Sequence, residues 1–170
     1  MHIDNSFSPD SKVWIYQSSR PFTLDEINVL REQLVSFTKQ WTAHNAQLKA
    51  HGDIIEDRII YLIVDETHTS ASGCSIDTSV HFIKSLENKF NIGLFDRTLF
   101  NYLKEGVISS AHLNELPELF STQVINMETI VFDPLVNSKS AFDAHFKTTL
   151  GESWLKNFTI RHFVRFAKLG

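Results

Sequence analysis

The chain has 170 residues, of which 42% are hydrophobic, and this is enough apolar surface for the core of one domain. Its formal charge of -4 at pH 7 argues against nucleic-acid binding, which needs clustered lysine and arginine. No run approaches the roughly 18 apolar residues of a membrane span, and the first residues are unlike a secretory signal. The single cysteine, Cys74, excludes an internal disulfide, so we expect a cytoplasmic protein.

The first segments of the chain predict a strand followed by a helix. Residues 12–18 alternate apolar side chains between two faces, which is typical of a strand. Residues 24–43 repeat apolar side chains at helical spacing, and Thr23 and Glu26 before them have the spacing of a capping box. We therefore expect a helix over residues 24–43.

Two further strands, a second helix and a last strand follow. The alternating segment 47–56 and the apolar run 58–66 predict a hairpin, and helical spacing predicts a helix that starts at about residue 75. A closing strand is expected over 96–105. This order is that of a ferredoxin-like βαββαβ sandwich, in which one antiparallel sheet carries two helices on one face. We therefore predict an α+β fold with this sandwich over residues 12–105.

Residues 106–170 are predicted to form a C-terminal α/β extension that packs on the same domain. Leucines around Pro117 indicate a short helix that is interrupted near this proline, and Ser140 can cap another. The tail from Lys156 onward mixes basic residues with phenylalanine. We expect its aromatic rings to dock on the parent domain, the alternative being contact with a membrane surface or an acidic partner.

Four stretches of the chain resemble a known family: VWIYQSSRPFT, FTKQWTAHNAQLKA, IIYLIVDET and above all ASGCSIDTSVHFIKSLE. The likeness extends to the TIVFDPLVNSKSAF and ESW segments. These stretches are similar to a bacterial family of small proteins that carries the label "ABC transporter ATPase". The label implies ATP hydrolysis.

ATP hydrolysis can be tested on the residues. IIYLIVDE matches a Walker B strand, in which Asp65 would hold Mg²⁺ and Glu66 would orient the attacking water. A Walker A loop of the form G-x-x-x-x-G-K is also needed to bind the phosphates, and none of the six glycines fits it. We therefore predict no ATPase activity.

The stretch SASGCSIDTSV is the strongest candidate site. If Ser75 caps the second helix, Cys74 lies just outside a helix start, where free amides favour a thiolate and can bind a carboxylate or phosphate. The alternative is structural: Gly73 supplies an unusual backbone angle, Ser75 is an ordinary cap and Cys74 is a small buried residue. The candidate ligand-binding residues are Ser70, Ser72, Gly73, Cys74, Ser75 and Asp77.

A catalytic role for Cys74 would need a base. His81 shares its side of the helix but lies about 10 Å further along the axis, so it is not a direct partner. The base would have to be His44, His51 or His68, whose positions relative to Cys74 are open.

We expect neither a metal ion nor a cofactor. Asp65, Glu66 and His68 cluster at a strand end, but no H-x-x-x-H or C-x-x-C spacing accompanies them. The sequence thus favours a non-catalytic binding or regulatory module, with a small anionic ligand or a partner protein at loop 66–75. A thiol-dependent enzyme using Cys74 is the alternative, and a structural protein whose strand edges pair into a homodimer is the third hypothesis.

Overall fold

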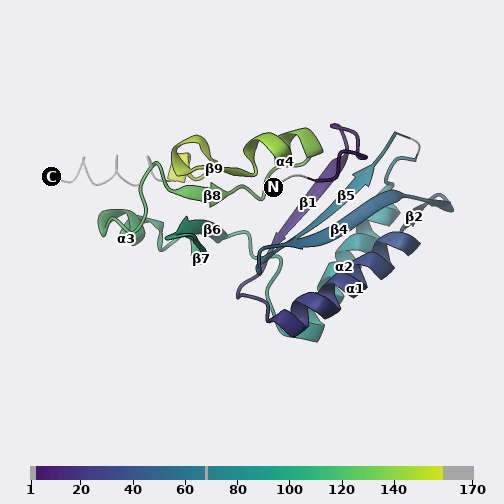
Figure 1. The fold of residues 1–170 in the computed structure, drawn as a ribbon, viewed down its shortest axis with the longest axis horizontal. Helices are drawn as coiled ribbons and strands as arrows, with labels where there is room; N and C mark the ends of the chain where they lie inside the picture. The colour runs from purple at the N-terminus through teal and green to yellow at the C-terminus, as the bar shows by residue number, and fades with distance from the viewer. Residues whose placement is uncertain (1–2, 68, 159–170) are drawn as a thin grey trace. The chain divides into compact units, whose positions relative to one another are not determined.

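A computed structural model describes residues 3–67 and 69–158 of the chain (Figure 1). It is a mixed α+β protein with antiparallel sheets, as predicted. In this part of the chain, no helix combines the length and the apolar composition needed to cross a membrane. His68 and most of the basic tail, on which two of the predictions fall, lie outside the described residues.

The chain divides into two compact units. The boundaries between them fall after residues 96, 133 and 144. One unit comprises Met1–Asp96 and Pro134–Ala144, and the other comprises Arg97–Asp133 and His145–Gly170.

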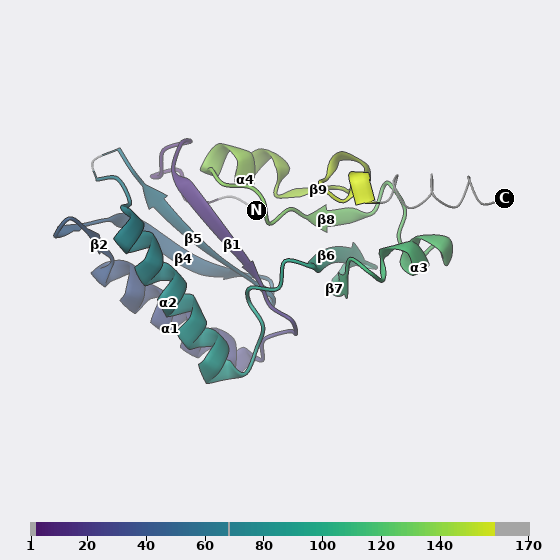
Figure 2. The ribbon, with the colours of Figure 1, turned by 180° about the vertical axis from the view of Figure 1, so that it is seen from behind.

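The first unit contains a three-stranded antiparallel sheet with two helices on one face (Figures 1 and 2). The strands lie in the order β1-β5-β4, and their register places Trp14, Leu62 and Gly52 side by side on the face that the helices cover. The elements are β1 (Lys12–Gln17), α1 (Leu24–Gln40), the short hairpin β2 (Thr42–Ala43) and β3 (Ala46–Gln47), β4 (Lys49–Ile55), β5 (Ile59–Asp65) and α2 (Gly73–Phe90).

Helix α1 starts as its sequence predicts. The Thr23 side chain accepts the Glu26 N–H while the Glu26 carboxylate accepts the Thr23 N–H, which completes the capping box. The guanidinium of Arg20 also donates to that carboxylate, and this contact together with the Thr23 N–H lowers the pKa of Glu26 to about 2. Leu30 and Leu34 then project into the core.

The predicted ferredoxin-like sandwich is not confirmed, because its fourth strand is not in this sheet. The segment predicted for it forms β6 (Leu99–Lys104), which pairs with β7 (Val107–His112) in a separate sheet. Glu105 and Gly106 both have positive φ angles, of 52° and 83°, as a two-residue hairpin turn requires. This local hairpin fixes the partner of β6.

A short segment from later in the chain lies along β1 instead. The Val13 N–H donates to the Asn137 carbonyl, the Lys139 N–H donates to the Ser11 carbonyl, and Lys12 bridges to Ser138. Helix α4 (Lys139–His145) follows, and its Phe142 ring lies 5.8 Å from that of Tyr61 on the sheet face opposite α1 and α2.

The second unit is a four-stranded antiparallel sheet with the order β7-β6-β8-β9. Phe100 and Val131 are fully buried in its core. Pro117 lies at the start of the helix here and does not interrupt it. The remaining elements are α3 (Leu116–Ser121), β8 (Ile130–Phe132), β9 (Lys147–Thr149) and the 3₁₀ turn Leu150–Glu152.

Candidate functional site

Asp65, at the end of β5, is occupied by internal contacts. Its carboxylate accepts from Lys49 Nζ at 2.8 Å and from the Thr67 N–H at 3.0 Å. The Thr67 hydroxyl and, at 3.3 Å, the Ser8 N–H donate to it as well. These contacts, with Lys49 first, hold the pKa of Asp65 well below its usual range. The carboxylate therefore joins the N-terminal segment, β4 and the loop after β5.

Glu66 also holds the loop. Its carboxylate accepts the Ala71 N–H at 2.8 Å and lies 3.3 Å from Lys12 Nζ. Both acids of the Walker-B-like run are thus engaged with the chain itself. Across residues 3–67 and 69–158, no three His, Cys, Asp or Glu side chains are grouped as metal ligands.

The helix cap was predicted at the wrong serine. Ser72, not Ser75, is the N-cap of α2, and Ser75 is the third helical residue of a reciprocal capping box. Ser75 N donates to Ser72 Oγ at 3.2 Å and Ser72 N donates to Ser75 Oγ at 2.8 Å. Trp41 Nε1 donates to the Ser75 carbonyl at 2.8 Å, so the first turn is anchored on the core. The two hydroxyls therefore serve the fold.

Gly73 and Cys74 are the exposed residues at this helix start. Two structural expectations are wrong here: Cys74 is not buried, and Gly73 is not in the left-handed region. A Cβ at Gly73 would meet nothing within 4 Å. The N–H groups of Gly73 and Cys74 donate to no other described residue, as is usual for the first turn of a helix. Ser70 and Asp77 are exposed nearby in the sequence.

No histidine of residues 3–67 and 69–158 is hydrogen-bonded to the thiol of Cys74. His44 is in the β2–β3 turn, with φ of 50°, and His51 is on β4, where its ring lies 6.0 Å from Tyr61. His81 is exposed on α2. No hydrogen bond joins the sulfur of Cys74 to any of them.

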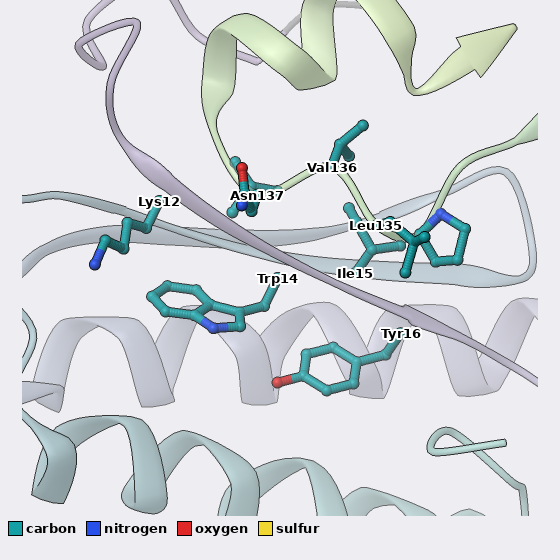
Figure 3. A pocket seen from close by; sticks show the side chains of 9 residues that line it. Lys12, Trp14, Ile15, Tyr16, Leu135, Val136 and Asn137 are labelled. Atoms are coloured by element: carbon teal, nitrogen blue, oxygen red, sulfur yellow. The ribbon is translucent and has the colours of Figure 1, made fainter. Parts of the chain in front are cut away.

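A pocket of about 330 Å³ lies elsewhere, between β1 and residues 134–137. Figure 3 shows Trp14 and Tyr16 pointing from β1 toward the helices, while Leu135 and Val136 lie on the other side. The lining is mainly apolar, and none of the residues predicted for the site contributes to it.

No family model, no curated protein and no solved structure matches the chain.

The sequence analysis did not identify three residues that hold the loop and the helix start in place: Lys49, Trp41 and Ser8. Lys49 had a readable signal, because a hairpin turning at Glu56 and Asp57 brings the start of one strand opposite the end of the next, and Lys49 pairs with Asp65. Ser8 and Trp41 had none, because their contacts join segments far apart in the sequence.

Proposed function

We propose that the protein is a non-catalytic binding module of the cytoplasm, with its site at loop 66–75 and the first turn of α2. Its ligand is a carboxylate or phosphate group, either free or carried by a partner protein. The observation that carries this proposal is the pair of exposed residues Gly73 and Cys74, whose N–H groups donate to no other described residue.

The contacts around the loop support a preformed site. Asp65 and Glu66 tie the loop to neighbouring segments, and the capping box fixes the direction of the first turn. Because these groups are already held, little ordering cost remains for a ligand. Lys12 largely offsets the charge of Glu66. The two amide donors therefore provide most of the attraction for an anion, and we expect weak binding with a Kd of about 1 mM.

A thiol-dependent enzyme is the second candidate, favoured by the exposure of Cys74. It needs a base in hydrogen-bond reach, and in the described part of the chain no side chain bonds to the sulfur. Alkylation of Cys74 at a series of pH values tests it. A reaction midpoint near the free-thiol value of about 8.5 supports the binding module, and a midpoint below about 7 supports the enzyme.

Gly73→Pro and Gly73→Ala form a matched test of the site. Proline removes one amide donor, it is favoured at the first helical position, and Ser72 before it has the extended backbone (φ -90°, ψ 165°) that proline requires. Alanine keeps the N–H and adds a Cβ in open space. We expect both variants to fold, and proline alone to weaken the binding of acetate or inorganic phosphate by about fivefold to tenfold.

Binding is measured by thermal shift and by titration calorimetry with each anion. Equal affinities for wild type and both variants would contradict the proposal, as would the absence of stabilisation by either anion. A peptide with a free C-terminal carboxylate, compared with its amide, separates a partner's carboxylate from a free anion.

A further inference from the structure

The outer edge of β4 is open. Because the Val13 N–H points outward from β1, the alternation of hydrogen bonds across the sheet directs the main-chain groups of Ala50, Gly52 and Ile54 outward from β4. The Ile54 N–H is bound by the neighbouring Asp53 carboxylate at 2.7 Å. Within the described chain, the N–H and C=O groups of Ala50 and Gly52 have no partner on this edge.

The opposite edge of the sheet is covered at its start. Asn137 and Lys139 bond to the first residues of β1, and beyond its end the Ser19 N–H donates to Gly93. Natural sheets protect long edges or use them for pairing, so the open main-chain groups of Ala50 and Gly52 on this seven-residue edge strand indicate an interface.

We propose that two copies of this chain pair through β4, antiparallel, with Gly52 opposite Gly52 of the second copy. This register places His51 opposite Asp53 of the second copy, and Asp53 opposite the second His51. Such directly opposed side chains lie about 5 Å apart and attract when their charges differ. Gly52 forms two main-chain hydrogen bonds across the axis, and the Ala50 N–H donates to the Ile54 carbonyl of the second copy.

The side of α1 next to this edge supports the same interface. Arg31 Nε bonds to Asp53 Oδ1 at 2.8 Å, which places that side of the helix beside β4. Leu24 and Val35 lie on the same side as Arg31 by helical spacing, and they are 80% and 41% exposed. A twofold axis through Gly52 would bring the two α1 helices together and cover these apolar side chains.

The Arg31–Asp53 pair does not close the edge. Both side chains are exposed, at 50% and 38%, so the pair contributes little and can rearrange. Asp53 Oδ2 has no bond in the described chain and can accept from His51 of the second copy.

Sedimentation equilibrium of the full chain, at about 1 to 200 µM, tests the proposal with Ala50→Pro and Ala50→Ser. We expect a mass approaching twice 19.5 kDa. Proline at 50 removes an N–H donor that the single chain does not use, and proline is tolerated on an edge strand. It should therefore weaken association about tenfold or more. Serine keeps the N–H donor and should leave association unchanged. Circular dichroism checks that each variant folds.

A charge exchange tests the register. His51→Asp should weaken the dimer by about fivefold, because it opposes two carboxylates, and adding Asp53→His should restore it. A single-chain mass throughout the concentration range overturns the proposal. So does a dimer that neither Ala50→Pro nor His51→Asp weakens, since it would then form through another surface.

Discussion

Replacing Asp65 with alanine is expected to lower the free energy of unfolding of the protein by about 2 to 4 kcal/mol. The side chain is 6% exposed, and its loss leaves the N–H groups of Thr67 and Ser8 without their acceptor and Lys49 without its counter-ion. Lys49 is 45% exposed, so water screens its ion pair with Asp65 and the pair adds little to this loss. Urea unfolding measures the change.

Asp65→Asn is the matched control. The amide keeps one acceptor oxygen but removes the charge, so about half of the loss is expected. Equal stability of wild type and Asp65→Ala would contradict the role given to this carboxylate in holding loop 66–75.

Acid should destabilise the protein through the same group. The pKa of Asp65 is lowered by its contacts with Lys49 and Thr67, and that of Glu26 is lowered to about 2 by Arg20 and Thr23. A lowered folded-state pKa gives stability that is complete above the unfolded value of about 4 and is lost as pH falls toward the folded value. Urea midpoints should therefore fall steeply between about pH 4.5 and pH 2, and less steeply in Asp65→Ala. Parallel pH profiles for the two proteins would contradict this assignment.

Replacing Trp41 with alanine is expected to lower the free energy of unfolding by about 3 to 5 kcal/mol. Trp41 is 1% exposed and its ring lies 5.0 Å from that of Phe37 and 5.9 Å from that of Trp14. Alanine would leave a cavity between α1 and the sheet and would also release the Ser75 carbonyl. Thermal and urea unfolding measure the loss.

Trp41→Phe separates packing from the hydrogen bond. Phenylalanine fills most of the space but cannot donate to Ser75, so about 1 to 2 kcal/mol should be lost. The rate of amide hydrogen exchange should then rise more at the first turn of α2 than elsewhere. Uniformly faster exchange, with no preference for residues 75–78, would show that the bond does not anchor this turn.

The local patterns of the sequence predicted most of the first unit. Thr23 with Glu26 marked a helix start, and the alternation in residues 47–56 marked the strand β4, because such signals depend only on neighbouring residues. The start of α2 was ambiguous since both Ser72 and Ser75 can cap. They form the two halves of one capping box.

The placement of β6 could not be predicted from its own residues. Leu99, Phe100 and Tyr102 suit a buried strand in any sheet. Its partner is decided by the turn at Glu105 and Gly106 and by β8 and β9, which come from later in the chain. The same holds for the candidate site, where Lys49 and Trp41 reach the loop only through the tertiary fold.

The most direct test of the binding site is a proton–nitrogen NMR titration of the protein with sodium acetate and with inorganic phosphate at constant ionic strength. The amide signals of Gly73 and Cys74 should move furthest and saturate together at one Kd, and Gly73→Pro should reduce the shift at Cys74. Signals that drift without saturation, or saturable shifts confined to another part of the chain, would contradict a binding site at the start of α2.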